Sequence, residues 1–209
     1  MMDMMDKNGI CYIVGAAPFD EPLPPLGAED FLIAADGGRK TLLARGLTPH
    51  LTVGDFDSGE APTEGEEPYI RFPVEKDDTD TALAVKEGMR RGYRYFMLYG
   101  GVGDIDHTLA NVQTLHRMAK EGLHGYLVGG GYVCTVLMEG SMRFCPKGRV
   151  SVFSLTDESV GVFERGLAYA LEDARLTNDT PLGVSNHGKG EPAEIGLSRG
   201  ALLIAWQAE

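Results

Sequence analysis

Short apolar runs alternate with helix-like segments over the first 130 residues of the chain. The runs are followed by segments that contain glycine, proline or acidic residues, which is typical of buried strands followed by loops. We place strands at 10–16, 31–35, 51–53, 69–72, 94–99 and 126–128. Between them, apolar residues recur at helical spacing and predict helices over 39–45, 79–91 and from Asp106 to Gly122. This alternation indicates an α/β domain with a mainly parallel sheet and helices on both faces.

The pattern changes near Gly129–Gly131. Beyond Tyr132 the apolar runs are short, lack a helical period and are separated by turn residues, with strands predicted at 135–138, 149–155, 161–163, 174–177, 193–197 and 201–206. Ser198-Arg199-Gly200 is typical of the turn of a final hairpin. We therefore predict two domains, an α/β domain over residues 1–130 and an all-β antiparallel sandwich over residues 131–209.

Composition narrows the possible partners and the compartment. The net charge of −12 argues against nucleic-acid and anionic membrane surfaces, which call for basic patches. No apolar run is long enough to span a membrane, and the first eight residues do not resemble a signal peptide, so we expect a cytoplasmic protein. The three cysteines show no CxxC spacing, which predicts buried free thiols and no structural zinc site.

Aspartates gather in two groups that follow predicted strands. Asp55 and Asp57 come after the third strand, and Asp77, Asp78 and Asp80 after the fourth. Like charges this close oppose folding unless a cation or hydrogen-bond donors compensate them, and a divalent ion is the simplest compensation. If residues 55–57 are extended, both carboxylates of that segment point to one face, where they suit Mg²⁺. The alternative is a surface turn and a helix cap, since aspartate is favoured in both places.

Further acidic residues belong to the same predicted edge. Asp36 and Asp106 also lie in segments that follow strands, and ligands of open parallel sheets bind beyond the carboxyl ends of the strands. The acidic groups therefore suggest metal-dependent phosphate chemistry. The chain contains no P-loop sequence, and Gly101-Val102-Gly103 lacks the third glycine of a dinucleotide fingerprint.

Several ordered blocks together are more specific than any single motif. They are Ala35–Gly38, GDFDS at 54–58, EKDDTDTALA at 75–84, Asp106–Asn111, Gly166–Tyr169 and Val184–Asn186. In this order they closely resemble the thiamine pyrophosphokinase family over nearly the whole chain. The resemblance implies an α/β catalytic domain followed by a β-sandwich, in a homodimer whose thiamine site lies between the sandwich of one subunit and the α/β domain of the other. It also implies that the thiamine hydroxyl attacks the β-phosphorus of ATP with Mg²⁺ as cofactor, giving thiamine diphosphate and AMP.

The resemblance also implies roles for individual residues. Asp55, Asp57 and Asp80 would be catalytic metal ligands with Asp77 beside them; Asp36, Gly37, Gly38, Lys76, Asp106 and His107 would lie at the nucleotide; and Tyr169, Ser185 and Asn186 would contact thiamine. An aromatic face and small polar groups suit a cationic heteroaromatic ligand. Tyr169 could instead be a core aromatic of the sandwich, and Ser185-Asn186 a simple turn.

One position departs from the family pattern. Where the family usually carries Gly-Arg-x-Asp-His, this chain has Gly103-Asp104-Ile105-Asp106-His107, and Asp104 inverts the charge of a phosphate-binding arginine. Either Arg39, Lys40 or Lys76 substitutes, or the nucleotide binds weakly or differently. Two other functions stay open: a non-catalytic protein that binds thiamine or a nucleotide, and a haloacid-dehalogenase-type phosphatase, whose DxD loop resembles Asp55-Phe56-Asp57-Ser58.

Overall fold

The chain folds into two compact units. The computed structural model describes residues 7–57, 61–75 and 77–208. The first unit comprises the described residues up to Thr114 together with Gly122–Gly130, and the second comprises Leu115–Glu121 together with the described residues from Gly131 onward. Within the described residues, no helix is both long and apolar enough to cross a membrane.

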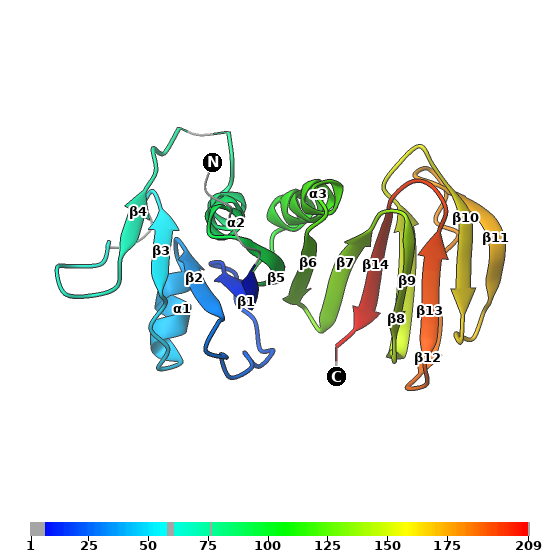
Figure 1. Cartoon of the computed structure of the whole chain (residues 1–209), viewed down its shortest axis with the longest axis horizontal. Helices are drawn as coiled ribbons and strands as arrows, with labels where there is room; N and C mark the ends of the chain where they lie inside the picture. The colour runs from blue at the N-terminus through cyan, green and yellow to red at the C-terminus, as the bar shows by residue number, and fades with distance from the viewer. Residues whose placement is uncertain (1–6, 58–60, 76, 209) are drawn as a thin grey trace. The chain divides into compact units, whose positions relative to one another are not determined.

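Within the described residues of the first unit, six strands pair in parallel in the order β6-β5-β1-β2-β3-β4 (Figure 1). The strands are β1 (Lys7–Val14), β2 (Phe31–Ala35), β3 (Leu51–Gly54), β4 (Tyr69–Arg71), β5 (Tyr93–Tyr99) and β6 (His124–Gly129), and the helices are α1 (Gly38–Ala44), α2 (Asp80–Arg90) and α3 (Ile105–Lys120). Helix α1 contacts β1 and β2, and α2 contacts β1, β2, β3 and β5. The mainly parallel α/β architecture is therefore confirmed, with element bounds that differ from the predicted ones by a few residues.

Helix α2 shows why the sequence located the helices well. The Thr79 hydroxyl accepts a hydrogen bond from the Ala82 N–H at 3.2 Å, which satisfies a backbone donor that the first turn would otherwise leave open. Ala82 and Val85 are buried, as their helical spacing predicted. Gly92 follows the last turn at φ +87°, a conformation that glycine adopts without strain.

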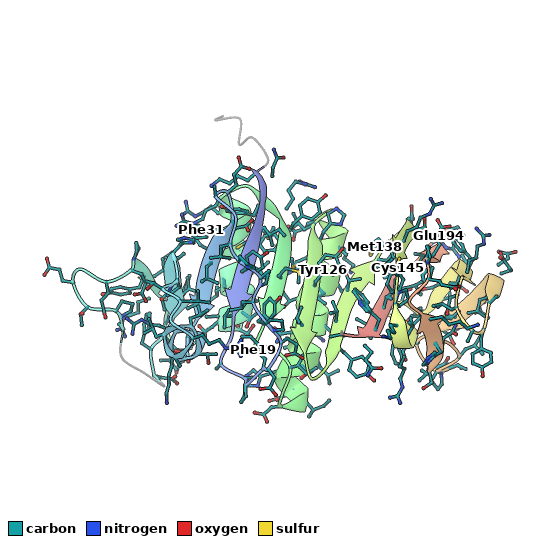
Figure 2. The ribbon with its side chains drawn as sticks, turned by 90° about the horizontal axis from the view of Figure 1, so that it is seen from below. Phe19, Phe31, Tyr126, Met138, Cys145 and Glu194 are labelled. Atoms are coloured by element: carbon teal, nitrogen blue, oxygen red, sulfur yellow. The ribbon has the colours of Figure 1, made fainter. Side chains whose placement is uncertain are left out.

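Strand β1 is the centre of the first unit and the place where the strand order reverses. Cys11, Ile13 and Val14 are fully buried, as expected of a strand covered on both faces. The chain continues from β1 to β2, β3 and β4 on one side and returns with β5 and β6 on the other. Figure 2 shows Phe31 and Phe19 at opposite ends of this sheet, and the Phe19 ring lies 5.3 Å from the Tyr99 ring at the carboxyl end of β5. Ligands of open sheets bind at such a reversal, beyond the carboxyl ends.

The described strands of the second unit pair antiparallel in two sheet segments, ordered β12-β9-β14-β7 and β11-β10-β13-β8. Their strands are β7 (Tyr132–Leu137), β8 (Gly140–Phe144), β9 (Lys147–Ser154), β10 (Glu158–Arg165), β11 (Leu171–Thr177), β12 (Asn186–Lys189), β13 (Ala193–Leu197) and β14 (Leu202–Gln207). Val152 of β9 and Ile204 of β14, from the first sheet, join Val162 of β10 and Ile195 of β13, from the second, in one buried cluster. An antiparallel β unit after the α/β unit is therefore confirmed.

The prediction of a final hairpin is wrong. Strand β13 pairs with β8 and β10, whereas β14 pairs with β7 and β9, so Ser198–Gly200 leads from one sheet to the other. Arg199 forms an isolated bridge with Val160 within this connection. A turn signal between two apolar runs locates a change of direction, but the pairing partner depends on which core face each strand covers.

Other details of the second unit were missed. Strands β8 and β12 were not predicted because they carry alternating exposed positions and few apolar residues. The three cysteines are free thiols as expected, but only Cys11 is buried, and the expectation of burial is wrong for the exposed Cys145. The short polar strands depend on neighbouring strands for their place in the sheet.

Candidate functional site

A cavity of about 470 Å³ opens at the strand reversal of the first unit. Residues from four loops and two helix N-termini line it: Gly15–Pro18, Ala35–Asp36, Thr79–Thr81, Gly100–Gly101, Gly103–Asp104, His107 and Asn111. Its size is within the range of pockets that bind nucleotides and other small molecules.

Two glycines let the backbones after β1 and β5 approach each other at the cavity. The Gly15 N–H donates to the Tyr99 carbonyl at 2.8 Å, and the Ala17 N–H donates to the Gly100 carbonyl at 3.0 Å. A Cβ atom on Gly100 would lie 2.4 Å from the Gly15 oxygen, and one on Gly15 would lie 2.6 Å from the Gly100 oxygen. Because neither position has room for a side chain, this wall is backbone, which a ligand can approach closely.

Helices α2 and α3 direct their N-termini at the same cavity. The N-terminal end of α2 contributes Thr79–Thr81, and the start of α3 contributes Asp104 and His107. Helix N-termini carry backbone N–H groups without intrahelical partners and a positive dipole end, which together favour phosphate groups. The buried Asn111 side chain donates to the Gly101 carbonyl at 2.8 Å and so ties α3 to the glycine loop after β5.

Three carboxylates gather at the ends of β2 and β3. Asp36, Asp55 and Asp57 each place one carboxylate oxygen so that all three atoms lie within 4.8 Å of one another. Asp36 has φ +46°, in the left-handed region that aspartate tolerates better than most residues, and its N–H donates to the Val53 carbonyl at 2.8 Å. A Cβ on Gly54 would lie 3.1 Å from the Asp36 Cα, so a glycine before Asp55 lets the two loops meet.

The geometry by which Asp55 and Asp57 meet is not the predicted one. Phe56 has φ +60°, so the segment is a turn, and the expectation of an extended strand is wrong. The Phe56 ring packs edge-on against Tyr69 at 5.6 Å, under the Arg71 guanidinium 4.9 Å from its centre, and Arg71 also donates to the Asp55 carbonyl at 3.1 Å. The left-handed turn at Phe56 is thus accompanied by contacts with Tyr69 and Arg71, the first and last residues of β4. The local sequence around Phe56 does not reveal these contacts.

The three-carboxylate cluster fits Mg²⁺. The ion prefers oxygen ligands at about 2.1 Å, so two ligands in one shell lie no more than roughly 4.2 Å apart. The oxygens of the cluster lie within 4.8 Å of one another, so small side-chain rotations would bring them within that limit. Asp36 belongs both to this cluster and to the cavity lining, so an ion held here would border the cavity.

Some of the other predicted site residues of the first unit line the cavity and others do not. Asp80 and His107 line the cavity. The described lining includes neither Asp77 nor Asp106, which are exposed; the His107 N–H donates to the Asp106 carboxylate at 2.8 Å and lowers the pKa of that group. Lys76 lies outside the described residues.

Gly37 and Gly38 contribute packing around helix α1. A Cβ on Gly38 would lie 1.8 Å from the Val14 oxygen, so glycine is needed where α1 starts against the end of β1. Gly37 precedes the helix, and a Cβ there would lie 2.9 Å from the Cβ of Ala16, a cavity residue. Both glycines therefore bring α1 and the cavity loop close together.

Arg39 is engaged elsewhere and does not line the described cavity. Its Nε donates to Glu67 at 2.6 Å, and its Nη2 lies 3.1 Å from a Glu66 carboxylate oxygen. The buried Glu67 also accepts a hydrogen bond from the Thr52 hydroxyl at 2.8 Å. No lysine or arginine is among the described residues that line the cavity. The positive charge that Asp104 does not supply is therefore not supplied by a lysine or arginine of the described lining either.

The thiamine candidates lie in the second unit. Tyr169 is 71% exposed, so the alternative of a core aromatic is wrong. Ser185 is exposed at φ +63°, and its N–H donates to the Ser151 hydroxyl at 3.1 Å. The side chain of Asn186 is buried and hydrogen-bonded to the backbone of Tyr169 on both sides, through Oδ1 at 3.0 Å and Nδ2 at 2.6 Å. Whether these residues contact thiamine stays a prediction.

Sequence reasoning missed Gly15, Gly100 and Asn111 as parts of the cavity. Gly15 lies near the end of the strand predicted at 10–16, and Gly100 directly follows the strand predicted at 94–99, which was the available signal for a close backbone approach. Asn111 carried no signal beyond its place in a helical block, because its partner Gly101 is identified only by the fold.

Comparison with known proteins agrees with this architecture. The family model described as "Thiamin pyrophosphokinase, catalytic domain" matches residues 26–127, a range that includes Asp36, Asp55, Asp57 and Asp80. A curated relative named thiamine pyrophosphokinase, from Bacillus subtilis (strain 168), is 26% identical over 184 residues, which are 82% of this chain and 85% of the relative.

Solved structures extend the similarity to both units. A thiamin pyrophosphokinase family protein from Enterococcus faecalis superposes with a TM-score of 0.83 at 25% identity, covering 95% of this chain and 99% of the other. Thiamin pyrophosphokinase from Geobacillus thermodenitrificans gives a TM-score of 0.81 at 25% identity, covering 96% and 98%. The Bacillus subtilis structure gives 0.82 at 23% identity, covering 96% and 99%, and supports the fold. The catalytic-domain model covers most of the residues that line the cavity, and these likenesses extend over almost the full length, so the chain is similar in sequence and fold to the thiamin pyrophosphokinase family.

Proposed function

We propose that the chain is a Mg²⁺-dependent thiamine pyrophosphokinase, which transfers the pyrophosphoryl group of ATP to the hydroxyl of thiamine and forms thiamine diphosphate and AMP. The observation that carries the proposal is the position of Asp36, which belongs to the three-carboxylate cluster and also lines the cavity. The metal that binds the triphosphate and the pocket that holds its phosphates would then both be bordered by Asp36.

The residues of the first unit have separate tasks in this proposal. Asp36, Asp55 and Asp57 would hold Mg²⁺, with Asp80 on the cavity wall as a further candidate ligand. The bound ion would offset the charge that develops on the transferred phosphates. The glycine backbone after β1 and β5 would let the phosphates approach the chain, and the N-termini of α2 and α3 would orient them.

Tyr169, Ser185 and Asn186 of the second unit would form the thiamine side. An exposed tyrosine ring offers a face to the cationic thiazolium or to the pyrimidine of thiamine. The net charge of −12 would also attract a cationic substrate. Since the Asn186 amide is occupied within its own unit, we assign it the task of holding the Tyr169 backbone.

The direct test is turnover. The chain is incubated with thiamine, ATP and Mg²⁺, and products are separated by chromatography; we expect equal amounts of AMP and thiamine diphosphate. ADP in place of AMP, or no product from thiamine, contradicts the proposal. A phosphorylated Asp55 trapped during turnover would instead indicate the phosphatase mechanism.

A second function, binding without catalysis, is favoured by one observation. Asp104 lines the cavity where the family usually carries arginine, and the described lining holds no other basic side chain than His107. Calorimetry that detects tight thiamine binding, together with no AMP at millimolar ATP and Mg²⁺, would establish this second function in place of the first.

The resemblance to the family also leads us to propose a homodimer in which each thiamine site combines the first unit of one subunit with the second unit of its partner. Asp57→Ala and Tyr169→Ala then inactivate different halves of the same site. Each variant alone should have little activity, whereas a heterodimer of the two carries one site with both changes and one site with neither.

Activity should therefore return when the two variants are unfolded together and refolded as a mixture, towards about a quarter of the wild-type rate for random pairing into dimers of two-fold symmetry. The control is each variant refolded alone. No recovery in a mixture that gel filtration shows to be dimeric would mean that each site lies within one subunit.

A further inference from the structure

A glutamate in the core of the second unit has no part in the function proposed above. Glu164 of β10 is fully buried, although its strand neighbours in the core are apolar, such as Val162. Its Oε2 accepts a hydrogen bond from Asn186 Nδ2 at 2.7 Å. Its Oε1 is buried and has no hydrogen-bond partner among the described residues.

The Asn186 side chain connects this carboxyl group to the loop that carries Tyr169. Its Nδ2 donates to Glu164 and to the Tyr169 carbonyl, and its Oδ1 accepts from the Tyr169 N–H and from the His187 N–H at 2.8 Å. All four hydrogen-bonding positions of the amide are therefore used. Without Glu164, one donor of Asn186 would be buried and unpaired.

The loop between β10 and β11 is held at further points. Gly166 turns at φ +74°, where a Cβ would lie 2.3 Å from the Pro192 oxygen, and the Ala168 N–H donates to the His187 carbonyl at 2.9 Å. The backbone of Tyr169 is thus fixed on both sides by Asn186, while its ring stays in solvent. A rigidly mounted, exposed aromatic is typical of a binding surface, because little ordering remains to be done when a ligand arrives.

A buried carboxyl group is an unfavourable way to fill a core position. Burial raises the pKa of Glu164, and the hydrogen bond from Asn186 opposes this only in part. An apolar side chain of similar size would avoid the desolvation of the carboxyl group. The benefit that offsets this cost is the hydrogen bond that fixes Asn186 in the orientation required by both bonds to Tyr169.

We propose that Glu164 is a positioning residue for the thiamine site, which acts through Asn186 to hold Tyr169 in its binding position. The inference rests on the function proposed above only for the identity of the ligand. The hydrogen bonds that connect Glu164 to the Tyr169 backbone can be tested without thiamine, through hydrogen exchange of the Tyr169 amide.

The test compares Glu164→Met, which removes the acceptor at nearly the same length, with Glu164→Gln, whose amide oxygen can still accept from Asn186. Hydrogen exchange of the Tyr169 amide, followed by NMR on the full chain, should be at least about tenfold faster in the methionine variant. Without Glu164 the Asn186 side chain is held less firmly, so the hydrogen bond from the Tyr169 N–H to Asn186 Oδ1 opens more often. The KM for thiamine should rise by a similar factor, with the KM for ATP unchanged and kcat within about threefold. The glutamine variant should stay close to the wild type in all of these values.

Glu172→Met is the matched control, since Glu172 lies on β11 at the surface and pairs with Arg165. Unchanged exchange at Tyr169 in Glu164→Met overturns the proposal, and so does faster exchange with an unaltered thiamine KM. Faster exchange at Tyr169 together with a raised thiamine KM in Glu164→Gln would also overturn it, because glutamine retains the hydrogen-bond acceptor. If Glu164→Met does not fold, Glu164→Leu makes the same removal with a different shape. A wild-type chain that fails to bind thiamine in calorimetry overturns the proposed function, whereas the exchange data still decide the hydrogen-bond chain.

Discussion

Replacing Asp57 by alanine should reduce kcat by at least about a thousandfold, because in the proposed function it removes a ligand from the ion that would offset phosphate charge during transfer. The expectation follows from the three-carboxylate cluster, whose oxygens lie within 4.8 Å of one another at the border of the cavity. The rate is measured as AMP formation with ATP, thiamine and Mg²⁺ at saturating levels. Glu64→Ala, a change at an exposed turn of the same unit, serves as the control and should leave the rate unchanged.

The same variant tests the metal site without relying on activity. Mg²⁺ should raise the melting temperature of the wild type by several degrees, because binding to the native state alone stabilises it by about 2.7 kcal/mol at a hundred times Kd. Asp57→Ala should lose most of this shift. It should also melt at a higher temperature than the wild type when Mg²⁺ is absent, since one of three mutually repelling carboxylates is gone. A shift of full size in the variant would place the metal elsewhere.

The third ligand can be identified in the same assay. The sequence resemblance assigned the metal to Asp55, Asp57 and Asp80, whereas the structure groups the first two with Asp36. Asp36→Asn should therefore remove more of the Mg²⁺-dependent shift than Asp80→Asn. The reverse order would mean that Asp80 turns towards the ion when the nucleotide is bound.

The elements of the first unit could be predicted because local chemistry determines them. Thr79 caps α2, Gly92 ends it, and the buried β1 is a continuous apolar run. The gathering of aspartates at one edge followed from the parallel direction of the strands, since the carboxyl ends of parallel strands share an edge.

What could not be predicted depends on contacts between distant residues. The left-handed turn at Phe56 goes together with contacts to Tyr69 and Arg71, which lie beyond the next loop. The sequence placed Asn186 among the thiamine contacts, but its amide is fully used by its own unit, and its partner Glu164 gave no signal in the sequence. Polar side chains in a motif indicate that hydrogen bonds matter there, without saying which groups they join.

Asp104→Arg should lower the KM for ATP by about tenfold or more, because an arginine at the phosphates adds charge-assisted hydrogen bonds worth about 1.5–3 kcal/mol and removes a repelling carboxylate. Asp104 lines the cavity, and neither Arg39 nor any other described lysine or arginine lines it. Arg39 is held by Glu66 and Glu67. Initial rates over a range of ATP concentrations give the KM, and Asp104→Asn separates the removal of negative charge from the gain of donors.

Glu121→Arg is the matched control, since it makes the same change in net charge at an exposed residue just beyond the other end of α3. Its KM for ATP should equal that of the wild type, and the advantage of Asp104→Arg should shrink as salt is raised. An unchanged or higher KM in Asp104→Arg would show that Asp104 itself makes a favourable contact with the nucleotide or its metal.

The stability of Asp104→Arg should fall while its affinity for ATP rises. The Asp104 carbonyl accepts from the Thr108 N–H at 2.9 Å and from the Thr108 hydroxyl at 3.0 Å, so Asp104 stands at the start of α3, where a carboxylate is favourable and a cation is not. Asp104→Arg should therefore melt at a lower temperature by an amount equivalent to about 1 kcal/mol while it binds ATP more tightly. A general effect of charge on folding would move both quantities together, so opposite signs would identify Asp104 as a residue that stabilises its helix and weakens the affinity for phosphate.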